Sequence, residues 1–203
     1  MDDIDVAEPP TPEVLDAPAT DDGQGSLDGS VDYTMETDLQ VQDATDALQQ
    51  LDGISPATWQ TLDAQGRLEA LQSVEDSMAA VQGRPGLSVE AEALGPGVCG
   101  AYDGSRLVVN AEQLDSATPV GEFVDTVVHE DRHAFQDFAV SHPGTVTDGT
   151  VVGAWAANME PGQYLSAEDY GLEAYAAQPI EADAWAYAGR IAQGLGLPRL
   201  ESE

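Results

Sequence analysis

Two of the three histidines in this 203-residue chain lie four positions apart, at His129 and His133, and Glu130 directly follows the first. In a helix, residues i and i+4 share one face, so the two imidazoles can reach a single metal ion. Apolar residues before and after the pair predict a helix that begins at about 119–122 and is buried on one side. They are Phe123, Val124, Val127, Val128, Ala134, Phe135, Phe138 and Ala139.

This His-Glu-x-x-His pattern predicts a hydrolytic zinc site. Zinc is the metal that suits two imidazoles and a carboxylate in a tetrahedral site, although affinity order alone does not exclude cobalt or nickel. Glu130 would lie beside the open coordination position, where it can act as general base on a metal-bound water. The plainer interpretation is a surface helix with two unrelated histidines.

A site of this kind needs a third protein ligand, and we expect Glu181 to supply it. Pro179 can occupy the first position of a helix, which places Glu181 in its first turn. Glu173 and Asp183 are the alternatives, because periodicity alone does not choose among neighbouring carboxylates.

The remaining His and the single Cys are weaker candidates. His142 lies beyond the helical face of the motif, so we expect it to be exposed or to support a ligand from behind. Cys99 lies upstream, in a predicted strand, and we expect it to pack as a small residue.

The charge is extreme, with 38 acidic residues, 6 basic residues, no Lys and a net charge of -32. Such a surface repels nucleic-acid phosphate and anionic membranes, so we expect neither as a partner. The acidity extends through the whole chain, which favours adaptation to high salt, where charge repulsion is screened. We find no signal peptide or membrane-spanning run. The expected location is the cytoplasm of a salt-adapted cell or a virus particle.

The chain divides into two predicted parts. Residues 1–36 are rich in Asp, Glu, Pro and Gly and poor in large apolar side chains, which predicts an acidic disordered leader. Residues 37–203 predict one α+β domain that is mainly helical with a small β-sheet. The expected elements are a helix over 38–51 ended by Gly53, helices from 55 to 82 with a break or bend at Gly66, strands within 87–94, 98–102 and 106–110 with a turn at 102–105, and helices from about 119 and 179. The Gly-, Pro- and Thr-rich stretch 141–166 is expected to be irregular and to form a wall or lid beside the metal.

The sequences at 129–136 (His-Glu-x-Arg-His-Ala-x-Gln) and 178–184 (Gln-Pro-Ile-Glu-Ala-Asp-Ala) resemble a family of small zincin-like metallopeptidase domains. These domains occur in bacterial, archaeal and phage or mobile-element proteins, some fused to toxin modules. The stretches 51–56 with Trp59 and 102–104 also resemble them, so the resemblance covers roughly residues 51–195. It implies a zincin-like fold of gluzincin type and a peptide or protein substrate. It also implies that His129, His133 and Glu181 bind zinc and that Glu130 is the catalytic base.

The chain departs from the better-studied gluzincins at one position. Their ligand Glu is followed four residues later by an Asp that orients a His, and here that position is Trp185. Asp183, Asp131, Asp125 or a backbone carbonyl would take this role. We expect Arg132 to pair with a carboxylate such as Asp183 or Glu181.

The sequence thus predicts a zinc-dependent peptidase, but it does not identify the side chain that stabilises the oxyanion. The candidates are Tyr170, Tyr175, Tyr187, Arg132 and His142. One alternative is a structural or virion-associated protein that keeps a zinc site without turnover and assembles into a larger particle. Another is an acidic decoy for a nucleic-acid-binding partner.

Overall fold

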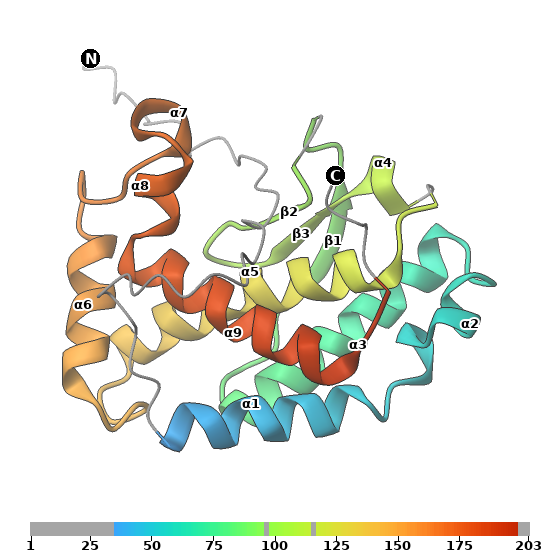
Figure 1. The fold of residues 1–203 in the computed structure, drawn as a ribbon, viewed down its shortest axis with the longest axis horizontal. Helices are drawn as coiled ribbons and strands as arrows, with labels where there is room; N and C mark the ends of the chain where they lie inside the picture. Colours follow the sequence, from blue (N-terminus) through green and yellow to red (C-terminus); the bar gives the residue numbers. More distant parts are fainter. Residues whose placement is uncertain (1–34, 96–97, 115–116, 199–203) are drawn as a thin grey trace, which may run out of the picture.

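A computed structural model describes residues 35–95, 98–114 and 117–198 of the chain (Figure 1). The fold is α+β and mainly helical, with one small sheet, as the sequence predicts. The elements in chain order are α1 (Met35–Leu48), the 3-10 helix η1 (Asp52–Ile54), α2 (Pro56–Trp59), α3 (Ala64–Gln82), β1 (Val89–Glu92), β2 (Gly100–Tyr102), β3 (Leu107–Asn110), α4 (Ala111–Leu114), α5 (Val120–Ser141), α6 (Gly149–Met159), α7 (Ala167–Tyr170), α8 (Leu172–Ala176) and α9 (Pro179–Leu195).

The three strands form a sheet in the order β1-β3-β2. Strand β1 runs parallel to β3, with Val89 opposite Leu107, and β2 runs antiparallel to β3, with Tyr102 opposite Leu107. The predicted turn joins β2 to β3, and Gly104 supplies its positive φ of 88°. Strand β2 therefore lies at an edge of the described sheet, next to the motif helix α5.

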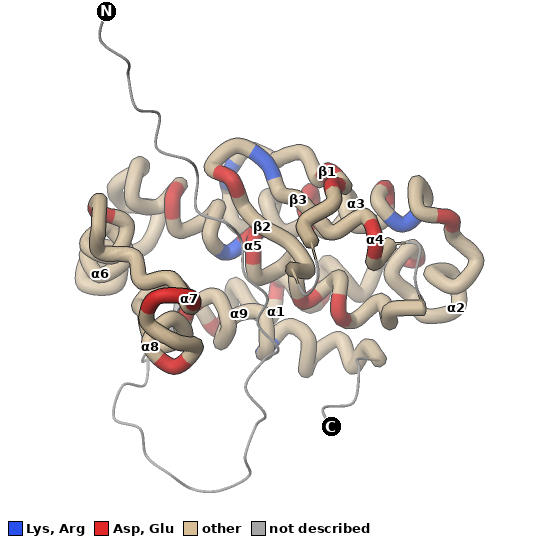
Figure 2. The backbone as a smooth tube through the Cα atoms, turned by 90° about the horizontal axis from the view of Figure 1, so that it is seen from above, with Lys and Arg blue, Asp and Glu red and all other residues tan. Residues whose placement is uncertain are grey.

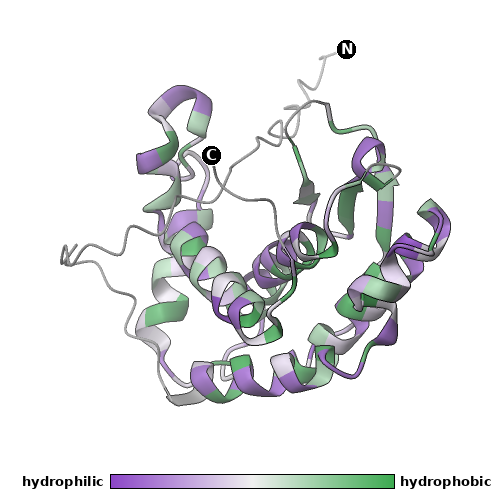
Figure 3. Cartoon of the chain, turned by 45° about the vertical axis from the view of Figure 1, so that its right-hand side comes forward, coloured by the Kyte–Doolittle hydropathy of each residue, from purple (hydrophilic) through white to green (hydrophobic). Residues whose placement is uncertain are grey.

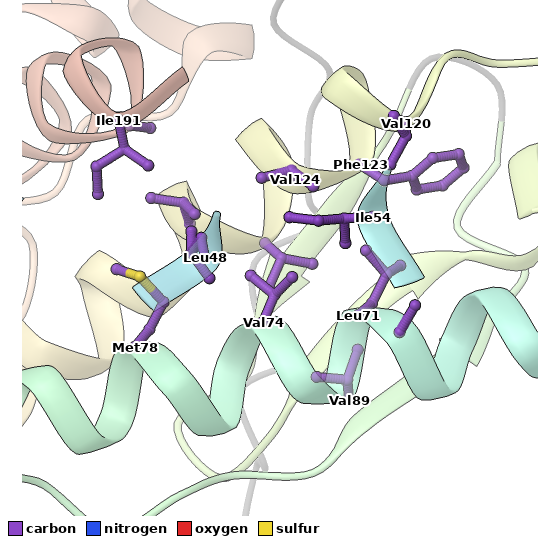
Figure 4. Packing of buried hydrophobic residues seen from close by; sticks show 14 of the residues in the cluster. Leu48, Ile54, Leu71, Val74, Met78, Val89, Val120, Phe123, Val124 and Ile191 are labelled. Carbon is purple, nitrogen blue, oxygen red and sulfur yellow. The ribbon is translucent and has the colours of Figure 1, made fainter. Parts of the chain in front are cut away.

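Helix α5 lies at the centre of the packing. It packs against α9, α3, α6 and the sheet, and most helices carry both hydrophobic and hydrophilic residues (Figure 3). The main core gathers apolar side chains from α1, α3, α5, α9 and the sheet, including Leu48, Val74, Phe123 and Ile191 (Figure 4). Burying each such side chain stabilises the fold by about 1.5–3 kcal/mol relative to exposure.

A second, smaller core surrounds the C-terminal half of α5. It contains Phe135, Ala139, Trp155 and Ile180 from α5, α6 and α9. The last α5 residue in the main core is Val128. The motif residues 129–133 therefore occupy the part of α5 between two cores, which fixes the helix on both sides of the site.

The N-terminal predictions need two corrections. Helix α1 begins at Met35, inside the predicted leader, and ends at Leu48 rather than at Leu51; Gly53 belongs to η1. Residues 1–34 lie outside the described residues. Gly66 does not break α3, because it lies in the first turn, where its N–H is bound by the N-cap carboxylate of Asp63. Ser55 caps α2 with Pro56 at its first position, as predicted.

The prediction of an irregular stretch at 141–166 is wrong in its middle. Helix α6 forms there, capped by Asp148, whose side chain accepts the N–H of Thr150. Trp155 is 2% exposed and its ring meets Phe135 edge-on, which anchors α6 to α5. The Gly- and Thr-rich composition hides a helix that tertiary packing stabilises.

Acidic residues occur on elements throughout the described fold, whereas basic residues occupy only a few places (Figure 2). Arg84, Arg106, Arg132 and Arg190 all pair with carboxylates, and Arg84 and Arg132 do so in buried positions. In the part of the chain that the structure describes, no helix has the length and apolar character needed to cross a membrane.

Candidate metal centre

Helix α5 and the first turn of α9 bring together the three residues predicted as ligands. The Nε2 atoms of His129 and His133 lie 3.1 Å apart. The Glu181 carboxylate faces both, with Oε2 at 3.5 Å from His129 Nε2 and Oε1 at 3.5 Å from His133 Nε2. In the described part of the chain this is the one group of His, Cys, Asp and Glu residues placed to hold a metal ion.

The spacing of these atoms is close to what zinc requires. Ligand atoms at roughly 2.0–2.1 Å from a tetrahedral zinc ion lie about 3.3–3.4 Å from one another. The two Nε2 atoms lie 3.1 Å apart, and each lies 3.5 Å from a different oxygen of the Glu181 carboxylate, so both oxygens face the position of the ion. His129 and Glu181 are 5% and 1% exposed. Within the described part of the chain, Glu181 Oε2 has no hydrogen-bond partner, as expected for an atom that a cation would satisfy.

The charges of the cluster are strongly coupled. Burial opposes protonation of His133, but contact with the Glu181 carboxylate outweighs burial and raises the pKa of His133 to about 9. Burial also opposes ionisation of Glu181, yet its contacts with the two imidazoles hold its pKa well below the usual range. The two pKa shifts have the same cause, the attraction between the Glu181 carboxylate and a protonated imidazole. The carboxylate thus attracts positive charge to the position between the histidines.

The first turn of α9 is fixed by Gln178, its N-cap residue. The buried Gln178 amide accepts the N–H of Leu165 at 2.7 Å and donates to the Leu165 carbonyl at 2.8 Å. Its oxygen also accepts from Asn158 of α6 at 3.1 Å. Gln178 thus holds the chain at 165 beside the turn of α9 that carries Glu181.

This clamp places Tyr164 at the cluster. The Tyr164 hydroxyl donates to Glu181 Oε1 at 2.9 Å, and its ring contacts Tyr175 edge-on. Burial and then the nearby Glu181 charge raise the pKa of Tyr164 above its usual range, with a smaller contribution from Glu130. The hydroxyl therefore keeps its proton at neutral pH and donates it to Glu181 Oε1.

Glu130 faces the sheet edge. Its Oε2 accepts the backbone N–H of Tyr102 in β2 at 2.9 Å, which fixes the carboxylate and leaves Oε1 with capacity for a proton. Gly100 permits this close approach, because a Cβ at that position would lie 2.6 Å from Thr126 Cγ2 and 2.9 Å from the Val108 carbonyl oxygen. The predicted general base is thus anchored by the strand beside it.

The alternative ligands lie elsewhere. Asp183 forms a buried pair with Arg132, as predicted, at 2.7 and 3.0 Å. Glu173 is exposed on α8, and Cys99 contacts Gln113 through its sulfur at 3.5 Å. His142 is exposed and stacks on Phe138, in line with the expectation that it is not a ligand.

Most of the proposed oxyanion donors are not at the cluster. Tyr170 is 60% exposed, the buried Tyr187 ring faces the Arg132 guanidinium, and Arg132 is committed to Asp183. Tyr175 is the exception: it contacts Tyr164, and burial and then the nearby Glu181 charge raise its pKa above the usual range, so this predicted donor lies near the cluster. Tyr164 was not among the predicted donors. Its position in the segment 141–166, the predicted wall of the site, was the one feature of the sequence that pointed to it.

The support of His129 also differs from the expectation of an orienting Asp. The Trp185 ring packs on the His129 ring at 4.3 Å. Within the described residues, His129 Nδ1 has no hydrogen-bond partner. Asp131 contacts Arg84 and Gln82 instead, and Asp183 contacts Arg132 and Gln136. Ring packing, rather than a carboxylate, therefore orients His129.

The chain matches no protein-family model, no curated protein and no solved structure at a significant level. The function proposed below therefore rests on the geometry of the site and on the sequence motif.

Proposed function

We propose that this protein is a zinc-dependent hydrolase that cleaves peptide bonds. The observation that carries the proposal is the convergence of one ligand atom each from His129, His133 and Glu181, all within 4.8 Å of one another, as a zinc ion requires. His129, His133 and Glu181 would hold the ion. Zinc bound there would polarise a substrate carbonyl and make a water molecule more acidic.

The chain's own residues have distinct parts in this reaction. Glu130 would accept a proton from the attacking water at Oε1, since Oε2 is held by the Tyr102 N–H, and would deliver it to the leaving amine. The protonated hydroxyl of Tyr164, which donates to Glu181 Oε1, would turn this hydrogen bond to the carbonyl oxygen and stabilise the negative charge that develops there.

The edge of the sheet favours a peptide as substrate. Tyr102 N–H faces Glu130 rather than β3, so the edge of β2 that faces away from β3 lies beside the general base. An extended peptide can add to such an edge through main-chain hydrogen bonds, which would bring its carbonyl groups to the cluster.

The first test is metal content, measured by mass spectrometry on protein purified in molar salt. We expect about one zinc ion per wild-type chain and its loss from both His133→Ala and Glu181→Ala. Hydrolysis of a mixed peptide library would then be measured on the loaded protein. A wild-type chain that binds no metal would refute the proposal.

A structural zinc without turnover is the competing function. Structural sites usually have four protein ligands, whereas the described residues supply three, with an anchored carboxylate next to the first. Zinc binding without hydrolysis of any library peptide would favour this alternative.

A further inference from the structure

We propose that Gln136 is a positioning residue that fixes the tautomer and orientation of His133 so that Nε2 faces the metal. This inference rests on the proposed metal site and identifies how one ligand is held in it. Gln136 lies three residues after His133 on α5 and is fully buried.

The orientation of the Gln136 amide follows from its partners. Its Nε2 lies 2.9 Å from the carbonyl oxygen of Ile180 and 2.7 Å from Asp183 Oδ2. Both are acceptors, so the NH₂ group must face them. The amide oxygen Oε1 then faces His133 Nδ1, at 2.9 Å.

This orientation determines the state of His133. Because Oε1 can only accept, Nδ1 must carry the proton of this hydrogen bond. A neutral His133 therefore has its lone pair on Nε2, the atom that lies 3.1 Å from His129 Nε2 and 3.5 Å from Glu181 Oε1. That is the tautomer a metal ligand requires.

The amide itself rests on a rigid base. Both oxygens of Asp183 accept from Arg132, and Oδ2 also accepts from Gln136. Asp183 and Arg132 are 1% and 2% exposed. Helix α9 thus supplies Glu181 as a ligand. Two residues later it supplies Asp183, the carboxylate that orients Gln136 toward His133.

The test compares Gln136→Met with a matched control, Gln82→Met. Gln82 is also buried and also donates its amide to an aspartate, Asp131 of α5, but it does not contact the ligands. Zinc dissociation constants are measured in molar salt by competition with a chelating dye. We expect Gln136→Met to weaken zinc binding about 10–100-fold and Gln82→Met to leave it unchanged. Equal affinities in the two variants would overturn the inference.

Gln136→Glu separates positioning from stability. A protonated carboxyl group at this position can donate to Asp183 and still present an acceptor to His133 Nδ1–H, so we expect zinc affinity close to wild type even where the melting temperature falls. In nitrogen-15 spectra of the zinc-loaded wild type, we expect a slowly exchanging proton on His133 Nδ1. Weak zinc binding by Gln136→Glu, or a rapidly exchanging Nδ1 proton, would overturn the inference. Zinc binding that depends on Gln136 without peptide hydrolysis would support it and refute only the hydrolase function.

Discussion

Substitution of Gly100 by Ala tests whether the sheet edge positions the general base. The new Cβ would lie 2.6 Å from Thr126 Cγ2 and 2.9 Å from the Val108 carbonyl oxygen. Ordinary carbon contacts are about 3.5–4.0 Å, so β2 must move away from α5 by up to about 1 Å. Tyr102, two residues along the strand, would lose its 2.9 Å contact with Glu130.

Overpacking of this kind costs about 1–3 kcal/mol. At about 2–4 °C per kcal/mol for a domain of this size, the melting temperature should fall by about 2–12 °C. A misplacement of about 1 Å at a catalytic group can lower turnover about 100-fold. Zinc affinity should stay unchanged, because the ligands belong to α5 and α9 rather than to β2.

Thermal unfolding, zinc affinity and peptide hydrolysis would be measured for Gly100→Ala, for Gly189→Ala and for Gly100→Ala with Thr126→Ser. Gly189 lies within α9 with nothing within 4 Å of its added Cβ, so Gly189→Ala should be neutral or stabilising by up to about 1 kcal/mol. Thr126→Ser removes Cγ2 but keeps the hydroxyl that donates to Glu122, and it should restore part of the loss. Wild-type turnover in Gly100→Ala, or no recovery in the double variant, would refute the reasoning.

Four further results follow from the site. Glu130→Gln should abolish hydrolysis while zinc content stays at the wild-type level; an unchanged rate would remove Glu130 from the mechanism. Tyr164→Phe should lower kcat by about 100–1000-fold without loss of zinc, and a change in KM alone would exclude an oxyanion role. Contact with Glu181 raises the pKa of His133 from 6.5 to about 9, so zinc competes with a proton and its affinity should rise about tenfold per pH unit up to about pH 9. In the zinc-free protein, protonated His133 should add to the free energy of unfolding measured in urea. This contribution should be complete below pH 6.5 and lost as the pH rises through about 9.

The residues that the sequence identifies at the cluster are those whose geometry is local. The spacing of His129 and His133 places both on one helical face whatever surrounds the helix. Pro179 fixes the start of α9, so the position of Glu181 in its first turn follows from the chain alone. The contact between this turn and the motif helix depends on tertiary structure, which local sequence does not determine. The resemblance to zincin-like domains led us to expect it.

The residues that support the cluster depend on contacts between distant segments. Gln136 gains its orientation from Ile180 and Asp183 of α9, and Tyr164 reaches Glu181 because Gln178 clamps the chain beside it. No periodicity marks such pairs. Helix α6 was missed for a related reason: its Gly, Thr and Val residues have weak helical preference, and packing of its Trp155 on α5 stabilises it.

Trp185 shows how the support of the predicted ligands differs from the expected orienting carboxylate. Residues 181 and 185 share a face of α9, so the side chain that follows Glu181 by one turn must meet the same cluster. Here it is a ring that packs on His129, and a ring without a hydrogen bond cannot select a tautomer. The orienting carboxylate is instead Asp183, which acts on His133 through Gln136. The orientation of His133 should therefore depend on a polar network and that of His129 on packing. Trp185→Phe keeps a ring on His129, so it should lower zinc affinity far less than Gln136→Met.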